Sequence, residues 1–466
     1  MFQTTKVLKT FVVLKDTPIV SLLSKIIVKF SEDKESSDLS SHFPARESRL
    51  IVIGGGAAGF FCAINAARLT PGLKVILLEK TNKLLSKVKV SGGGRCNVTH
   101  ALFDITEMSK RYPRGQHFVK KTFHQFFTTD TIKWFEERGV PLKEEKDGRM
   151  FPVTDSSQSI INCLMKEANG YGVEIMMNAE VKGIVNSSET KPQKAFSVLL
   201  NESRMLTADF ICIATGGYPK SSMFQWLANL GHTIAEPVPS LFTFNLPAGQ
   251  QELPKHPITA LMGVSVENAK IKIEGTKLSE EGSVLITHWG LSGPAVLRLS
   301  AWRARELKIM NYEFRIHINW MPQFNEQRLK SEFQTFRGSF ANKRISNHNF
   351  SFLPNRLWQF LLGQSGIKEE IRWADLNSKN ENLLITNLVD YALEVKGKTT
   401  FKEEFVTAGG INLSEIDANT MMSKKISNLY FAGEVMDVDG ITGGFNFQHA
   451  WTSGWIAGKA IAEQVA

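Results

Sequence analysis

The feature that most constrains this chain is a glycine-rich turn between an apolar strand and an apolar helix. Residues 49–53 (RLIVI) predict a buried β-strand, and the turn GGGAAG at residues 54–59 follows it directly. Small and aliphatic residues then favour a helix to residue 69, and residues 74–78 predict a second strand that ends at Glu79. A strand, a Gly-x-Gly-x-x-Gly turn, a helix and a second strand in this order are typical of a Rossmann-type α/β fold that binds a dinucleotide.

Each residue type in this turn has a physical role in dinucleotide binding. Gly54 permits the tight turn, Gly56 lets the backbone approach a pyrophosphate, and Gly59 lets the helix pack closely on the sheet. The helix N-terminus offers unpaired N–H groups to the phosphates, and Glu79 is placed to bind the ribose hydroxyls. A purely structural glycine turn is the alternative. The residues expected to bind the dinucleotide here are Gly54, Gly56, Ala57, Ala58, Gly59, Glu79 and Lys80.

Three further glycine-rich segments lie far from this turn in the sequence. SGGGRCN at residues 91–97 predicts a backbone concavity for an anion. A buried strand at residues 208–214 leads into Thr215 and Gly216, and a strand at residues 428–432 leads into a long glycine-rich stretch and a helix. The additional residues expected to contact the cofactor are Gly93, Gly94, Arg95, Cys96, Asn97, Val181, Thr215, Gly216, Gly433, Glu434, Asp437, Gly443, Gly444, Phe445 and Asn446.

From residue 49 to residue 466 the chain resembles the YhiN-like (HI0933-like) bacterial flavoproteins, the aminoacetone-oxidase-like and bile-acid-reductase-like group. The motifs that carry the resemblance, besides the first turn and SGGGRCN, are GRMFP at 148–152, ATGG at 214–217, THWGLSGPA at 287–295 and LYFAGEVMDVDGITGGFNFQHA at 429–450. The resemblance implies FAD as the cofactor, on a glutathione-reductase-like FAD domain that is interrupted by an inserted module. The chain departs from the common family pattern at residues 218–221 and at His100, where Asn is common.

The chain has one complete Gly-x-Gly-x-x-Gly unit and no Cys-x-x-Cys pair. A pyridine-nucleotide-disulfide reductase needs a second such unit and a redox-active dithiol, so this class is excluded. If NAD(P)H is the reductant, we expect it to bind only transiently.

The expected fold class is α/β, with a Rossmann-type FAD domain in two segments, residues 48–240 and 405–466. Short strand patterns, among them 263–266 and 271–273, predict an inserted β-rich domain over residues 241–322. Helical spacing of apolar residues predicts an inserted helical domain over residues 323–404. Residues 1–47 read as a poorly ordered N-terminal extension.

Composition limits the remaining classes of function. The net charge is +9, but Lys and Arg are scattered and no block of like charges occurs, so no nucleic-acid partner is expected. No apolar run is long enough to span a membrane, and the four cysteines show neither a disulfide framework nor metal-ligand spacing. We therefore expect a cytoplasmic protein without a metal that acts on a small-molecule substrate; its oligomeric state is left open.

Flavin chemistry requires few protein groups because the cofactor itself carries the hydride. The N–H groups of Gly443, Gly444, Phe445 and Asn446 begin a helix and are expected to stabilise negative charge on the flavin. His288 is a candidate general acid or, equally, a structural histidine. Cys96, beside a cation, is either a reactive thiolate or, more often in such a place, a packing residue.

The sequence thus predicts an FAD-dependent oxidoreductase that transfers hydride between flavin N5 and a small or steroid-like organic substrate. Two alternatives stay open. The basic balance of charge is compatible with an FAD-dependent RNA-modifying protein. A flavin-binding sensor without catalysis is the other.

Overall fold

The computed structural model describes residues 47–186, 196–201, 204–247, 255–400 and 406–465. The N-terminal extension expected over residues 1–47 therefore lies, apart from Glu47, outside the described residues. None of the helices in these ranges is long and apolar enough to cross a lipid bilayer.

A five-stranded parallel sheet forms the centre of the dinucleotide domain. Its strand order is β20-β10-β1-β2-β6, and the predicted first and second strands are β1 and β2 with the bounds expected. Nearly all residues of its strands β1, β2, β10 and β20 are buried, as is usual for a parallel sheet that is covered on both faces. The strands are β1 (Arg49–Ile53), β2 (Lys74–Leu78), β6 (Glu174–Met176), β10 (Phe210–Ile213) and β20 (Leu429–Phe431).

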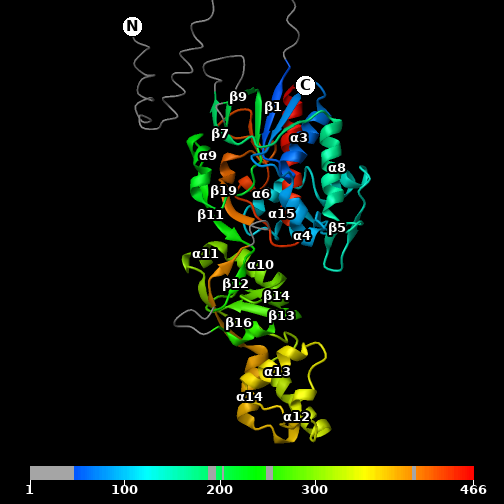
Figure 1. Cartoon of the computed structure of the whole chain (residues 1–466), viewed down its shortest axis with the longest axis vertical. Helices are drawn as coiled ribbons and strands as arrows, with labels where there is room; N and C mark the ends of the chain where they lie inside the picture. The colour runs from blue at the N-terminus through cyan, green and yellow to red at the C-terminus, as the bar shows by residue number, and fades with distance from the viewer. Residues whose placement is uncertain (1–46, 187–195, 202–203, 248–254, 401–405, 466) are drawn as a thin grey trace, which may run out of the picture. The chain divides into compact units, whose positions relative to one another are not determined.

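Two helices from opposite ends of this domain's sequence pack against each other on the sheet. These are α3 (Ala57–Leu69) and α15 (Phe445–Val465), seen as blue and red ribbons in Figure 1. A Cβ atom at Gly454 of α15 would lie 2.6 Å from the carbonyl oxygen of Ala58. The helices therefore approach closely only because this position has no side chain.

Smaller elements complete the dinucleotide domain. Val181 and residues 196–200 lie in a three-stranded antiparallel sheet, β7-β8-β9. The remaining strands are β3 (Thr99–His100), β4 (Leu142–Glu144), β5 (Arg149–Pro152), β7 (Val181–Asn186), β8 (Phe196–Leu200), β9 (Met205–Ala208), β11 (Ile234–Ser240) and β19 (Val406–Ile411). The helices are α4 (Ser86–Gly94), α5 (Ile105–Ser109), α6 (Gln116–Thr122), α7 (Thr128–Glu136), α8 (Ser157–Gly170) and α9 (Gln225–Asn229).

The inserted module has its own hydrophobic core and a seven-stranded antiparallel sheet of order β17-β16-β13-β14-β15-β12-β18. Its strands are β12 (Thr243–Asn245), β13 (Ser265–Ile273), β14 (Ser279–Ile286), β15 (Gly290–Ser292), β16 (Glu313–Asn319), β17 (Tyr391–Lys396) and β18 (Lys398–Thr399). Its helices are α10 (Pro294–Trp302), α11 (Ala304–Ile309), α12 (Glu326–Phe340), α13 (Asn355–Gln364) and α14 (Ser378–Val389).

The module differs from the sequence expectation in two respects. The strands expected at 263–266 and 271–273 are one strand, β13, whose pairing register shifts between Val266 and Ala269. The division at residue 322 does not separate strands from helices, because β17 and β18 return to the same sheet after α12–α14. β18 has only two residues, and β17 begins two residues after α14 ends, so the helical pattern before them hid their pairing.

Candidate functional site

A cavity of about 680 Å³ opens at the carboxyl ends of three neighbouring parallel strands. Gly54, Ala214 and Ala432 follow β1, β10 and β20 directly, and all three line the cavity. Ligands of open α/β sheets bind at this edge because the loops that follow the strands meet there. The fold therefore brings together glycine-rich motifs that lie far apart in the sequence.

The first turn has the geometry of a dinucleotide cradle. A Cβ atom at Gly59 would lie 1.9 Å from the carbonyl oxygen of Gly54, so α3 contacts the turn backbone to backbone. At Gly56 a Cβ atom would meet nothing within 4 Å, and no side chain caps α3 there. The N-terminus of α3 is thus open toward the cavity, and its unpaired N–H groups suit a pyrophosphate.

Glu79 lines the cavity beside this turn. Its Oε2 accepts a hydrogen bond from the Gly55 N–H at 3.0 Å, and its Oε1 accepts from the Thr81 hydroxyl at 2.8 Å. Lys80 also lines the cavity, with its ammonium 5.9 Å from the centre of the Tyr218 ring. Glu79 therefore fixes the turn and presents a carboxylate to the cavity, as binding of a ribose requires.

The glycine-rich loop before α15 forms another part of the wall, and Asn97 holds it in place. The side-chain NH₂ group of Asn97 donates to the Thr99 carbonyl at 3.0 Å, and its side-chain oxygen accepts a hydrogen bond from the Gly444 N–H at 2.9 Å. His100 Nδ1 donates to the Gly443 carbonyl at 3.0 Å, and burial lowers the pKa of this histidine. The Gly444 N–H is thus engaged by the protein, and contact of the cofactor with the N–H groups of Gly443, Phe445 and Asn446 stays a prediction.

SGGGRCN contributes its backbone to the cavity but not its cation. Gly92 and Gly93 have φ values of 57° and 69°, interrupt α4, and line the cavity with Asn97. The Arg95 guanidinium pairs with Glu145 at 2.5 Å and lies 4.1 Å from the Phe151 ring centre. Its charge is therefore compensated by the protein itself.

Cys96 is fully buried, and burial raises the pKa of its thiol to about 12. A thiol with this pKa is protonated at neutral pH, which favours the packing interpretation of this residue over the reactive one.

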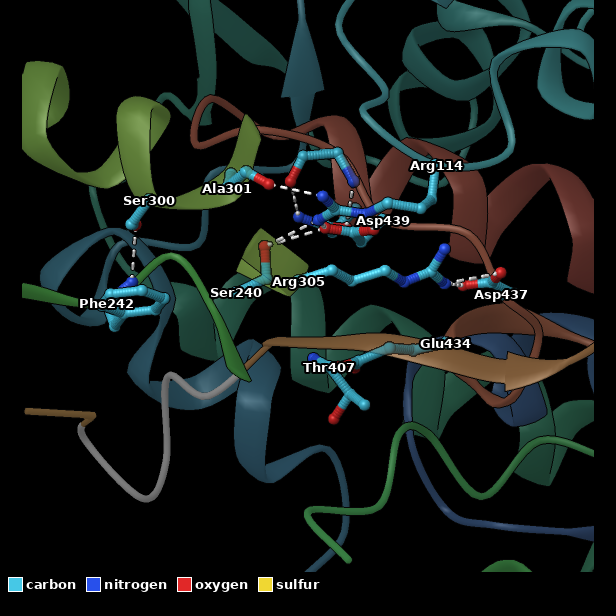
Figure 2. Close-up of polar contacts among 12 residues, drawn as sticks. Arg114, Ser240, Phe242, Ser300, Ala301, Arg305, Thr407, Glu434, Asp437 and Asp439 are labelled. Atoms are coloured by element: carbon cyan, nitrogen blue, oxygen red, sulfur yellow. Dashed lines mark hydrogen bonds and ion pairs between the residues drawn. The ribbon is translucent and has the colours of Figure 1, made fainter. Parts of the chain in front are cut away.

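The loop after β20 carries three acidic residues, and the two expected to contact the cofactor have different surroundings (Figure 2). Glu434 lines the cavity, accepts the Thr407 N–H at 2.7 Å and pairs with Lys87 at 2.6 Å. Asp437 pairs instead with Arg305 of the inserted module at 2.8 Å. Glu434 is therefore the acidic residue of this loop that faces the cofactor space.

Most of the residues predicted from the sequence line the cavity. Those outside its lining are Gly59, Gly94, Arg95, Cys96, Val181, Asp437, Phe445 and His288. Gly59 acts through packing, and Phe445 is buried against the His100 ring. His288 is exposed, beside Trp289. Its role as a general acid stays a prediction.

The sequence did not indicate the residues that the inserted module adds to the cavity. These are mainly Leu241, Thr243, Ser292, Leu297, Thr399 and Thr400. Trp289 of THWGLSGPA donates to the Thr243 hydroxyl at 3.1 Å, so this motif supports the wall and also contributes Ser292 to it. His449 of α15 was also missed, although it lies within the motif at residues 429–450.

The walls fit FAD on three counts. The open α3 N-terminus and the bare glycine backbone suit a pyrophosphate, Glu79 suits a ribose, and the start of α15 suits a polar flavin edge. The space then continues to hydroxyl and aliphatic side chains of the insert, where a substrate would contact the cofactor.

Residues 48–460 match the family described as the HI0933-like protein Rossmann domain. The chain is 31% identical over 422 residues to a ribosomal RNA dihydrouridine synthase of Escherichia coli (strain K12), covering 88% of this chain and 97% of the relative. It is 27% identical over 425 residues to a 3-dehydro-bile acid delta(4,6)-reductase of Clostridium scindens, covering 90% of this chain and 100% of the relative.

Among solved structures, a flavocytochrome c3 fumarate reductase aligns with 17% identity and a TM-score of 0.47, covering 93% of this chain and 83% of that one. The cavity lined by the glycine turn at residues 54–59 and the family match over residues 48–460 lead to the same assignment of family and activity. The chain belongs to the HI0933-like family and is an FAD-dependent oxidoreductase.

Proposed function

We propose that this enzyme reduces a carbon–carbon double bond conjugated to a carbonyl group in a ring. The observation that carries this proposal is the continuous cavity that runs from the dinucleotide turn to the hydroxyl-bearing wall of the insert. The reactions named for both relatives have this chemistry in common. Dihydrouridine is uridine with two hydrogens added across a bond conjugated to a carbonyl, and a 3-dehydro-delta(4,6) bile acid is a conjugated enone.

In such a reaction, FAD in its reduced form would supply a hydride to the carbon far from the carbonyl, and a proton from solvent would add to the carbon next to the carbonyl. Negative charge then develops on the carbonyl oxygen, and hydrogen-bond donors placed there stabilise the transition state. Thr243 donates to the Thr399 carbonyl at 3.1 Å, and Thr399 donates to Asn245 at 3.0 Å, so their hydroxyls are engaged. Ser292 and Thr400 have no side-chain partner among the described residues and line the cavity. We assign them to the substrate carbonyl.

The reaction is tested anaerobically with the purified protein, whose flavin spectrum reports reduction and reoxidation. NADPH, NADH or dithionite reduces the flavin, and a cyclic enone such as a 3-keto-4-ene steroid or a uridine-containing RNA is then added. We expect reoxidation by at least one of these substrates with loss of its double bond, detected by mass spectrometry as a gain of two mass units. A reduced flavin that oxygen reoxidises but neither substrate does would overturn the proposal.

RNA is the second candidate for the substrate, and the charge of one segment favours it. Residues 108–127 contain five Lys and Arg and no Asp or Glu. His117 and Lys121 on α6 and His124 just after it are exposed at helical spacing, and none of the three has an ion pair among the described residues. The segment adjoins the cavity wall, because the Arg111 carbonyl accepts the Ile441 N–H at 3.0 Å. A phosphate backbone would be attracted to such a surface.

The RNA candidate predicts binding that weakens steeply with salt. Fluorescence anisotropy with a labelled uridine-containing RNA would show a smaller salt slope for K120E/K121E than for the wild type. K270E/K272E on β13 is the matched control, because these lysines lie in the insert sheet. Equal slopes for all three proteins would remove α6 as an RNA-binding surface, and reoxidation by the steroid alone would assign the small-molecule substrate.

A further inference from the structure

His449 is a buried histidine in the cavity wall for which the described protein supplies no hydrogen-bond partner. It lies in the first turns of α15, and its side chain is 2% exposed. Among the described residues, neither Nδ1 nor Nε2 has a hydrogen-bond partner. Buried polar groups in folded proteins are nearly always hydrogen-bonded, so this ring requires a partner that the cavity accepts.

The surroundings of the ring keep it neutral. Burial lowers the pKa of His449 to about 4, and a contact with the Gly433 backbone, which falls short of hydrogen-bond geometry, opposes this shift only in part. A neutral imidazole has one N–H donor and one nitrogen acceptor. The ring can therefore both donate to and accept from a polar group in the cavity, without bringing a charge into it.

The position of the ring identifies the part of the cofactor that it faces. The Gly433 backbone beside it is so close to the α3 N-terminus that a Cβ atom at Gly433 would lie 2.8 Å from the Cβ of Ala58. A pyrophosphate in this fold lies at the N-terminus of that helix. His449 is thus placed between the glycine-rich turn at residues 54–59 and the loop after β20.

We propose that His449 is a cofactor-binding residue whose imidazole hydrogen-bonds to the ribityl–pyrophosphate chain of FAD. The inference rests on the FAD assignment and is independent of the substrate proposed above. It explains why a histidine is tolerated unpaired in the wall of an otherwise well-packed helix interface. The cofactor, rather than the protein, completes its hydrogen bonding.

A second buried histidine provides the matched control. His232 is 4% exposed and its Nδ1 is also unpaired among the described residues, but its Nε2 lies 2.9 Å from the Ser423 hydroxyl. His232 does not line the cavity. Substitution of His232 tests the effect of disturbing a buried imidazole without touching the cofactor.

The experiment compares the purified holoenzyme with H449F, H449Q and H232Q. Release of FAD on dilution, followed by flavin fluorescence, gives the dissociation constant, and the visible spectrum reports the flavin environment. We expect H449F, which keeps an aromatic ring and removes both nitrogens, to weaken FAD binding by about tenfold or more. H449Q keeps a donor and an acceptor and should recover part of this loss, and H232Q should bind FAD as the wild type does.

An FAD dissociation constant within twofold of the wild type for both His449 variants would overturn the proposal. So would an equal loss in H449F and H232Q, because it would show a general effect on folding. If H449F does not fold, H449Q decides the question alone: weakened binding with an unchanged circular dichroism spectrum supports the contact, and unchanged binding rejects it. None of these readouts depends on turnover, so a failure of the proposed reaction leaves the test intact.

Discussion

The carboxylate of Asp439 accepts hydrogen bonds from both Nε and Nη2 of Arg114, in a pair that is almost completely buried (Figure 2). Asp439 is 0% exposed and the Arg114 side chain 10%. The same guanidinium donates to the Ser240 hydroxyl at the end of β11 and to the Ala301 carbonyl in α10. One side chain therefore joins the loop before α15 to the segment where the chain enters the inserted module.

Replacing Arg114 by Gln should destabilise the protein by about 3–5 kcal/mol, because a buried carboxylate would lose its partner. Burial already raises the pKa of Asp439, and Arg114 opposes this shift. Chemical denaturation measures the loss. The neighbouring pair Arg305–Asp437 is the control, since Arg305 is 45% exposed and R305Q should cost about 1 kcal/mol or less. Similar losses of unfolding free energy in the two variants would show that burial does not increase the contribution of the Arg114–Asp439 pair to stability.

Gly59→Ala should abolish FAD binding or folding, since its Cβ atom would lie 1.9 Å from the Gly54 carbonyl oxygen and α3 would have to move away from the turn. The flavin absorbance of the purified variant measures this. Gly72→Ala is the control, because a Cβ atom there meets nothing within 4 Å. A Gly59→Ala protein that retains stoichiometric FAD would contradict the close packing described for the turn.

The four cysteines should not react with a thiol reagent in the native protein at pH 8. All four are free and buried, and burial raises the pKa of Cys96 to about 12 and that of Cys163 to about 11. Titration with Ellman's reagent should therefore detect less than one thiol in the folded protein and four in denaturant. Rapid modification of Cys96, identified by peptide mass mapping, would restore the reactive-thiolate interpretation.

In the flavin-free protein, His449 should make stability fall as the pH is lowered. Its pKa is lowered from 6.5 to about 4, so between these values the unfolded chain binds the proton and the folded chain does not. The stability linked to this group is fully present above pH 6.5 and is lost toward pH 4. Between pH 7 and pH 4 the free energy of unfolding, measured by chemical denaturation, should fall by about 3 kcal/mol more in the wild type than in H449Q. Parallel pH curves for the two proteins would show that His449 is not held neutral.

His288→Gln should lower the rate of substrate reduction by less than twofold, because this side chain is exposed and does not line the cavity. Ser292→Ala, which removes a cavity hydroxyl, should lower the rate by tenfold or more if that hydroxyl binds the developing oxyanion. Stopped-flow reoxidation of the reduced flavin measures both rates. A large loss in His288→Gln would support its role as general acid.

The sequence predicted the dinucleotide domain well because its signals are local. Residues 49–53 and 74–78 form the expected strands, and the helix begins at Ala57, since buried apolar runs and a glycine turn depend little on distant contacts. By contrast, apolar residues recur at helical spacing over residues 118–137, but the structure divides this segment into α6 and α7. Phe123, Phe126 and Phe127, which lie between them, are all buried, and apolar spacing alone did not reveal the break.

The site was predicted in part for the same reason. The backbone roles of glycines such as Gly54 and Gly443 can be inferred from the motifs that contain them, and the structure brings these glycines to one cavity. Thr243 and Thr399 reach this cavity only because β12 pairs with β18 across more than a hundred residues of insert. His449 gave no local sign of being unpaired, because that property depends on what surrounds it after folding.

The close contact between α3 and α15 also has a consequence for the order in which the chain can fold during its synthesis. The ribosome makes α3 early, but the surface that Gly454 presents to Ala58 exists only after the whole inserted module has left the exit tunnel. The insert has its own core and can fold first, as domains commonly do during translation. Until α15 emerges, the apolar face of α3 has to be shielded, so the nascent chain should be a substrate for chaperones throughout the synthesis of the insert.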